Sequence, residues 1–158
     1  MNSGIVFFAR LLLVLLFLPF SALDKVLNFK NAVVQASGVT STAWIAKLLI
    51  LAGFAAEVLM STAILTGFAD RLAALIMALY CVLTAVLWKR FWKSPDFRLQ
   101  GRSEGRALFW DFLKNLSVAG GFLLLAIAAN GSGVNEIVAH PFGSTHPYET
   151  ASRDEPQP

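Results

Sequence analysis

Four long apolar stretches alternate with polar connections along the chain, at residues 5–23, 43–65, 72–88 and 107–129. Each approaches or reaches the roughly 20 residues that an α-helix needs to cross about 30 Å of hydrocarbon. Barrel strands would alternate apolar and polar residues, and these stretches do not, so helices are expected. The pattern predicts an all-α integral membrane protein, with a four-helix bundle formed by residues 1–130.

The polar segments between these stretches predict how the helices are connected. Gly67 can end the second helix and Asp70 can cap the third, which predicts a tight antiparallel hairpin. The first connection mixes apolar and polar residues and predicts a short interfacial helix that ends near Gly38. Residues 131–158 are rich in Gly, Pro, Ser and charge, and they predict a mostly disordered C-terminal tail.

The first apolar stretch also has features of a secretory signal, because residues 11–18 form an apolar run before a candidate cleavage region at 19–22. A membrane span is the better interpretation. Residues 5–8, which precede Arg10, are themselves apolar. Cleavage at the end of the candidate region would place bulky Phe20 where a small residue is needed.

Basic residues predict the orientation of the bundle. The connection between the third and fourth helices holds six basic and two acidic residues: Lys89, Arg90, Lys93, Arg98, Arg102 and Arg106, with Asp96 and Glu104. The positive-inside rule places this connection in the cytoplasm and both termini on the other face, as in a bacterial-type inner (plasma) membrane. The four tryptophans lie at helix ends on that same side and predict an interfacial belt: Trp44, Trp88, Trp92 and Trp110.

Composition agrees with the membrane class, since 56% of the residues are hydrophobic. A formal charge of +3 would also suit a nucleic-acid-binding protein. The basic residues cluster beside apolar spans, however, so a positive edge facing lipid headgroups is expected and a nucleic-acid partner is not. Cys81 is the single cysteine and lies inside an apolar stretch, where a packing role is expected.

Two ionisable residues lie within the first and second predicted spans, where burial of a charge is costly. Arg10 is about five residues into its helix and Glu57 is about eight residues from the matching end of the next. Their similar depth predicts that Arg10 and Glu57 are buried together as an ion pair. The pair would be either structural or part of a pocket for a ligand or a proton, and absence of contact is the third alternative.

A second group of polar residues lies near the opposite edge of the bundle. Lys25 ends the first helix, and Trp110, Asp111, Lys114 and Asn115 lie early in the fourth. The last three have i, i+3 and i+4 spacing and can share one helix face. These five residues are candidate ligand contacts, suited to a quinone or a lipid headgroup. The alternatives are a packed salt-bridge cluster and a lysine that extends to the headgroups.

Motifs for catalysis are not found in the sequence, so the catalytic residues are unknown and no metal site is expected. There is no Gly-rich phosphate loop, no HExxH, no GxSxG and no pair of intrahelical haem histidines. His140 and His146 lie in the tail, and two histidines alone do not form a metal site. No covalently bound cofactor is expected, and a bound quinone is the one cofactor proposed.

Three groups of residues carry a resemblance that spans about residues 8–135. The first helix opens at Arg10 and closes on Lys25. Ser21 lies near a position that is commonly glycine in the family that these residues resemble. The second and most specific group is Glu57 with the turn LTGFADRLAA at residues 65–74, and the third is FLKNL at 112–116 with the glycines that follow. These groups resemble the DoxX family of small four-helix membrane proteins.

The resemblance implies an accessory subunit of a membrane redox system, expected to be a non-catalytic subunit and not an enzyme in itself. Such a subunit would belong to a quinone-linked oxidoreductase, or would anchor a soluble redox enzyme at the bilayer. The expected partners are lipid, a soluble or membrane redox protein, and further copies of the chain. Two alternatives stay open: a transporter of a small solute or protons that uses Arg10 and Glu57, and a purely structural or assembly subunit.

Overall fold

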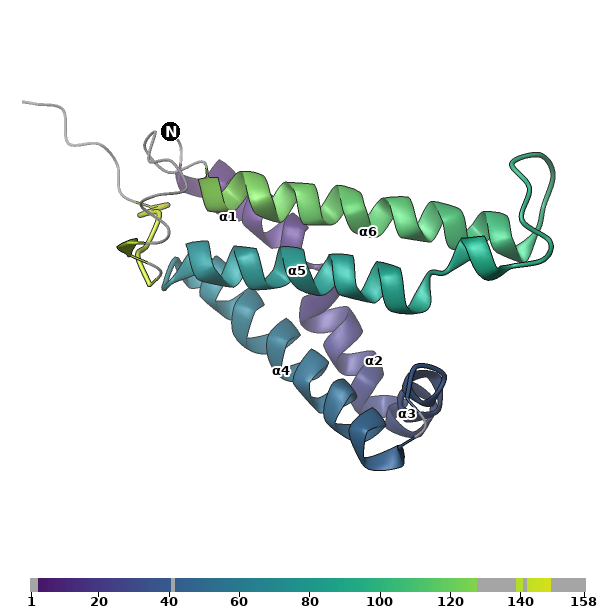
Figure 1. The fold of residues 1–158 in the computed structure, drawn as a ribbon. Helices are drawn as coiled ribbons and strands as arrows, with labels where there is room; N and C mark the ends of the chain where they lie inside the picture. Colours follow the sequence, from purple (N-terminus) through teal and green to yellow (C-terminus); the bar gives the residue numbers. More distant parts are fainter. Residues whose placement is uncertain (1–2, 41, 128–138, 141, 149–158) are drawn as a thin grey trace, which may run out of the picture.

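The computed structural model describes residues 3–40, 42–127, 139–140 and 142–148, and these residues form helices and connections without a strand. Four helical stretches are long and apolar enough to cross a membrane: Ser3–Leu27, Ala43–Thr66, Asp70–Lys93 and Glu104–Ile127. The predicted all-α fold with four spans is confirmed, and the chain is a multi-pass membrane protein (Figure 1).

The first span is broken in its middle. It consists of α1 (Ser3–Val14), the π-helical turn η1 (Leu16–Ser21) and α2 (Ala22–Leu27). Pro19 lies in the turn, and Leu18 before it has non-helical angles of φ −121° and ψ 113°. Proline has no N–H to donate and disfavours helical angles in the residue before it, so the break is expected here. The direction of the chain changes between α1 and α2 as a result (Figure 1).

The short helix predicted in the first connection is α3 (Phe29–Ser37), and Gly38 is its C-cap as expected. Helix α3 packs against the start of α4 (Ala43–Thr66), where Ala36, Ala46 and Ile50 form a small buried cluster. The indole N–H of Trp88 donates to the Gln35 carbonyl at 3.4 Å. These contacts fix α3 at the end of the bundle that carries the tryptophans.

Helices α4 and α5 (Asp70–Trp88) form the predicted tight hairpin. Gly67 ends α4 with φ +80°, a left-handed conformation that glycine adopts without strain. The expected cap is wrong, however, because Ala69 occupies the N-cap position and Asp70 is the first residue of α5. The Asp70 carboxylate is therefore available for a contact elsewhere in the bundle.

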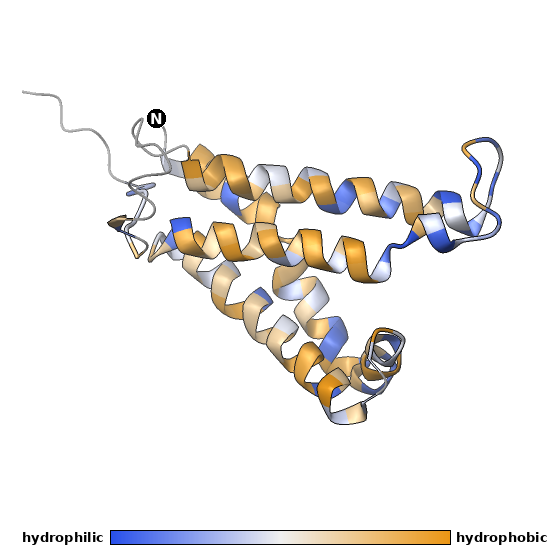
Figure 2. Ribbon diagram, viewed as in Figure 1, coloured by the Kyte–Doolittle hydropathy of each residue, from blue (hydrophilic) through white to orange (hydrophobic). Residues whose placement is uncertain are grey.

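Helix α6 (Glu104–Ile127) follows a connection that contains the short 3₁₀ helix η2 (Phe91–Lys93). All four spans contribute to one buried apolar core, which includes Val14, Ile64, Met77, Cys81 and Phe122. The packing role expected for Cys81 is confirmed. The outer surfaces of the helices are also strongly apolar, as a bilayer requires, and polar residues gather at the connection before α6 (Figure 2).

Candidate functional site

Charged side chains are buried at two separate levels of the bundle. Arg10 and Glu57 are both buried, with 6% and 1% of their surfaces exposed, as the sequence predicts. The predicted ion pair between them is wrong, because each has a different partner. Arg10 pairs with Asp70, and Glu57 pairs with Lys25.

The first level joins Arg10 to three other segments of the chain. Its guanidinium Nη2 lies 2.7 Å from Asp70 Oδ2 and also donates to Thr145 Oγ1 at 2.6 Å. Its Nη1 donates to the Ile64 carbonyl near the end of α4 at 2.6 Å. A planar guanidinium with several fixed donors suits such a junction, since it holds a carboxylate, a carbonyl and a hydroxyl together. One residue thus links α1, α4, α5 and the tail.

Part of the tail belongs to this junction. The Thr145 backbone N–H donates to Asp70 Oδ1 at 2.8 Å, and its hydroxyl donates to Asp70 Oδ2. The Tyr148 hydroxyl donates to the Leu65 carbonyl, and Pro147 lies close to Gly67. The prediction of a mostly disordered tail assigned no contact to residues 142–148, and the remaining tail residues lie largely outside the described part of the chain.

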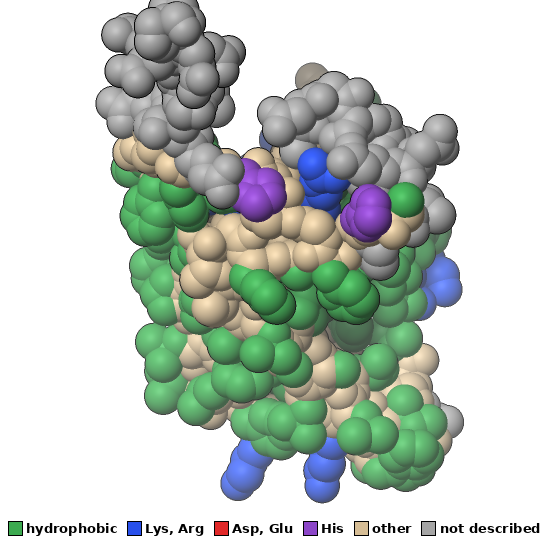
Figure 3. Space-filling view, turned by 90° about the vertical axis from the view of Figure 1, so that its left-hand side faces the viewer, with side chains coloured by type: hydrophobic (Ala, Val, Ile, Leu, Met, Phe, Trp, Pro, Cys, Tyr) green, Lys and Arg blue, Asp and Glu red, His purple; other side chains and the backbone are tan. Residues whose placement is uncertain are grey.

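The two histidines of the tail lie at the surface of this end of the molecule (Figure 3). His140 and His146 are both exposed. Within residues 142–148, the Thr145 and Tyr148 side chains bond to Asp70 and to the Leu65 carbonyl, next to the Arg10–Asp70 pair.

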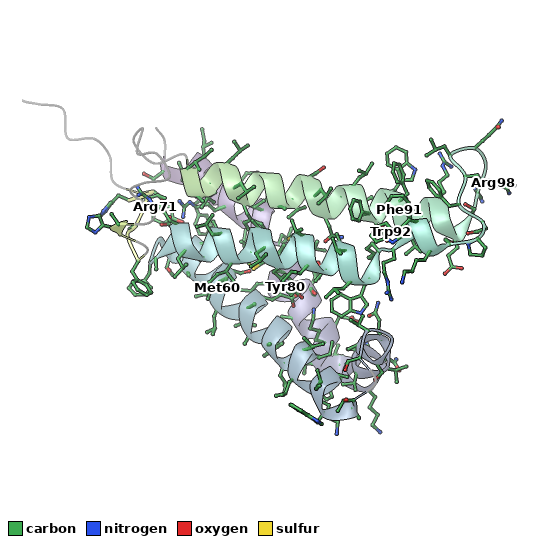
Figure 4. The ribbon with its side chains drawn as sticks, in the orientation of Figure 1. Met60, Arg71, Tyr80, Phe91, Trp92 and Arg98 are labelled. Atoms are coloured by element: carbon green, nitrogen blue, oxygen red, sulfur yellow. The ribbon has the colours of Figure 1, made fainter. Side chains whose placement is uncertain are left out.

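The second level is formed around Glu57 by three spans. Lys25 Nζ lies 2.7 Å from Glu57 Oε1 and 2.9 Å from Oε2. The Ser21 hydroxyl donates to Glu57 Oε1 at 2.9 Å, and the Tyr80 hydroxyl donates to the same atom at 2.8 Å. Tyr80 can come this close because Gly53 has no side chain, and a Cβ there would lie 3.2 Å from the Tyr80 hydroxyl. Figure 4 shows Tyr80 between α5 and the crossing of α4 with the first span.

All the donors of the Lys25 ammonium are used within this cluster. An ammonium group has three N–H donors. They meet Ser21 Oγ at 2.8 Å and the two carboxylate oxygens of Glu57. A ligand carbonyl would have to displace one of these acceptors, so the cluster is built first of all as a cross-link between spans.

The depth estimate behind the predicted Arg10–Glu57 pair failed for a geometric reason. Arg10 contacts the Ile64 carbonyl, seven residues beyond Glu57 on α4, which corresponds to about 10 Å along the helix. Counting residues from the predicted helix ends ignored both the break at Pro19 and the acid at the start of α5. Asp70 was therefore closer to Arg10 than Glu57 was.

The five candidate ligand contacts are divided between two places. Lys25 belongs to the Glu57 cluster, whereas Asp111 pairs with Lys89 at 3.1 Å and with Lys114 at 3.3 Å. The Asn115 side chain donates to the Asp111 carbonyl of its own helix at 2.9 Å. Lys114 contacts Asp111, as the i, i+3 spacing allows, whereas Lys25 pairs elsewhere. Trp110, also on α6, is exposed.

The connection before α6 has a defined conformation of its own. Asp96 accepts the backbone N–H groups of Glu104 and Gly105 at 2.8 and 3.0 Å, which caps the start of α6. The Ser94 hydroxyl donates to Asp96 at 2.6 Å, and together with these two N–H groups it holds the pKa of Asp96 below its usual value. These hydrogen bonds therefore contribute to folding stability above the ordinary aspartate pKa. Their contribution is lost as the pH falls through the lower pKa that Asp96 has in the folded state.

Aromatic rings attach this connection to the helices. The Phe91 ring lies 5.1 to 5.4 Å, between centroids, from four others: Trp92, Phe97, Phe109 and Phe112. Figure 4 shows Phe91 and Trp92 packed at the junction of η2 with α6, and Arg98 extending away from the bundle. Of the basic residues here, Lys93, Arg98 and Arg102 are exposed. The connection thus presents cations on a fixed support.

We expect Gly105→Ala to disrupt this support. A Cβ at Gly105 would lie 2.8 Å from the Phe97 Cα and 2.9 Å from the Ser94 Cβ, too close without movement of the backbone. Overpacking of this kind typically costs about 1 to 3 kcal/mol. Thermal unfolding in detergent measures the loss. Gly120→Ala is the matched control on the same helix, because nothing lies within 4 Å of a Cβ there, and it should be neutral or stabilising.

Several polar residues of these sites were not singled out from the sequence as partners. Asp70 was interpreted as a cap and Thr145 as part of the tail, and Tyr80 and Ser21 were assigned no contact. Lys89 was counted only as a loop charge. A usable signal existed for Tyr80 alone: a tyrosine within an apolar span needs a hydrogen-bond partner for its hydroxyl.

The family model described as DoxX matches residues 5–90, more than half of the 158 residues. The match includes both buried ion pairs and ends before α6, so the resemblance noted at residues 112–116 lies outside it. Neither the curated proteins nor the solved structures include a match to this chain.

Proposed function

Because the chain belongs to the DoxX family, we propose that it is a membrane-embedded accessory subunit of a quinone-linked redox system. Its role in that system is to anchor a soluble redox enzyme at the membrane surface. The observation that carries this proposal is the basic connection between α5 and α6, held in one conformation by Asp96 and the Phe91 ring cluster.

Charge and position both suit this connection to a protein partner. Six basic against two acidic residues leave residues 89–106 with a net charge of +4. Helix α6 begins six residues before Trp110, so the connection stands about 9 Å beyond that interfacial ring. Exposed apolar side chains lie among the cations, at Trp92, Phe97 and Leu99. Aromatic and arginine side chains are common anchors of protein interfaces, and opposite charge on a partner would speed association.

The two buried clusters support a scaffold role more than transport. Each ion pair is held by further hydrogen bonds, at Thr145 and Ile64 in one case and at Ser21 and Tyr80 in the other. Removal of either partner during a transport cycle would leave a buried charge unpaired, which is costly. The same observation favours the second candidate function, a purely structural subunit that holds other membrane proteins together.

Quinone enters the proposal as the electron acceptor of the assembled system. Electrons would pass from the soluble enzyme to a quinone in the bilayer, which takes up two electrons and two protons to become a quinol. The Lys25 ammonium is a poor hydrogen-bond donor for a quinone carbonyl, because the three N–H groups of Lys25 are already used. On this chain, the exposed Trp110 ring and the neighbouring Lys114 remain the proposed quinone contacts.

We further propose that the basic connection faces the cytoplasm of a bacterial-type cell and that both termini lie outside. Reporter fusions to position 130 test this orientation. A reporter that is active only outside the cytoplasm should be active there, and a fusion at Gln100 should show the opposite pattern. Cytoplasmic activity at position 130 would contradict the orientation and leave the four spans unaffected.

Docking of the soluble enzyme is tested by photocrosslinking in native membranes. A photoreactive phenylalanine analogue at Leu99, which is 64% exposed, should crosslink to a soluble oxidoreductase with an acidic surface. Arg98→Glu with Arg102→Glu should reduce that adduct at least about tenfold, since like charges then face each other. The same analogue at Phe142, exposed at the opposite end, is the control and should not form it. Adducts with lipid alone at Leu99, or yields unchanged by the double substitution, would contradict the proposal.

A further inference from the structure

A groove with a volume of about 250 Å³ lies between α2, the start of α3 and the middle of α4. Its lining residues are Lys25, Val26, Phe29, Ile50, Leu51 and Phe54. The ammonium of Lys25 is bound to Glu57 and Ser21, so the contribution of this residue to the groove is its aliphatic stem. The groove therefore offers hydrocarbon contacts to its occupant.

Two exposed lysines are close along the chain to residues that line this groove. On α4, Lys47 precedes Leu51 by four residues and Phe54 by seven, so the three share one helix face. Trp44, one turn earlier on that face, is exposed, and the Lys47 side chain is exposed as well. On the other wall, exposed Lys30 follows Phe29 directly. An apolar lining with two lysines on the neighbouring helix turns matches an acyl chain with an anionic headgroup.

We propose that this groove binds an anionic phospholipid, with an acyl chain along Leu51 and Phe54 and the phosphate between Lys30 and Lys47. Asp24, the acidic residue nearest to Lys30 in the sequence, is exposed and accepts a hydrogen bond from the Asn28 side chain at 2.7 Å. Helix α3, which carries Lys30, packs on the first turns of α4, so both lysines belong to the same end of the bundle (Figure 1). A zwitterionic phospholipid would fill the groove equally well, but its own cation would offset the attraction of its phosphate to the two lysines.

The experiment compares lipid retention by the full chain from mixed bilayers. The chain is reconstituted in nanodiscs of phosphatidylcholine with a minor fraction of phosphatidylglycerol, and native mass spectrometry counts the lipids that stay bound. We expect enrichment of phosphatidylglycerol over its bulk fraction by about fivefold for each lysine, from about 1 kcal/mol per cation at an anionic headgroup. Lys30→Gln with Lys47→Gln should return the bound lipids to the bulk ratio.

Controls separate this groove from other basic surfaces. Lys93→Gln removes an exposed lysine of η2 that does not line the groove, and it should leave the enrichment unchanged. Leu51→Trp should lower retention with both lysines in place, because it fills the groove. Bulk-ratio retention by the unmodified chain would overturn the proposal, and so would enrichment that survives the double substitution. Equal thermal stabilisation by inorganic phosphate and by phosphatidylglycerol would also overturn it, since the acyl chain would then contribute nothing.

Discussion

Glu57→Ala is expected to destabilise the bundle by about 3 to 5 kcal/mol, the typical cost of removing one partner from a buried ion pair. The substitution leaves the Lys25 ammonium without its carboxylate and also removes the acceptor of the Ser21 and Tyr80 hydroxyls. Reversible unfolding in mixed detergent micelles measures the change in free energy. Tyr80→Phe, which removes a single donor to a charged acceptor, should cost about 1.5 to 3 kcal/mol.

Double substitutions identify the partner of Glu57. Lys25→Met combined with Glu57→Gln should cost much less than the sum of the two single changes, because no unpaired charge remains. Arg10→Ala combined with Glu57→Ala should be close to additive, since the two residues belong to contacts about 10 Å apart along α4. Additive losses for Lys25 with Glu57 would contradict the observed pairing.

Asp70→Asn should produce a loss of similar size, about 3 to 5 kcal/mol, at the other buried level. The amide keeps the shape of the carboxylate but removes the charge that Arg10 pairs with at 2.7 Å. It also provides one acceptor oxygen where the carboxylate accepted from both Thr145 groups. Thermal unfolding of the full chain in detergent measures the loss of stability. Truncation of the chain before Thr145 should by itself produce part of this loss.

Asp111→Asn is the matched control for Asp70→Asn. Both residues are aspartates with lysine or arginine partners, but the Asp70 side chain is fully buried and the Asp111 side chain is 39% exposed. Half-exposed ion pairs contribute about 0 to 1 kcal/mol, because water screens them. Equal losses for the two substitutions would mean that burial does not determine the strength of the Arg10–Asp70 pair.

The outline of the fold followed from the sequence because bilayer thickness sets a length that apolar stretches must reach. That length located the four spans, Gly67 marked the hairpin, and Gly38 marked the end of α3. The partners of Arg10 and Glu57 did not follow, because pairing depends on how helices are rotated and staggered against one another. Asp70 carried a second, local explanation as a helix cap, which concealed its tertiary role.

Contacts of the tail were also beyond sequence reasoning. Residues 142–148 have no periodic apolar pattern, and their attachment depends on a hydroxyl and a backbone N–H that meet one buried carboxylate. A composition typical of disorder does not predict such an attachment, because it does not identify the buried carboxylate that the tail contacts. The basic connection was predicted as a charge cluster, but its rigid conformation depends on Asp96, a residue counted only as an opposing charge.

The order in which the ribosome makes the chain gives the Arg10–Asp70 pair a role in biogenesis. Arg10 enters the membrane in the first span, and its counter-charge is synthesised sixty residues later. Until the α4–α5 hairpin inserts, that span carries an unpaired cation, which translocon insertion disfavours by up to about 2.5 to 3.5 kcal/mol, the cost at the centre of a span. We therefore expect the nascent first span to stay beside the insertion machinery until Asp70 arrives, and Asp70→Asn to prolong its crosslinking to that machinery.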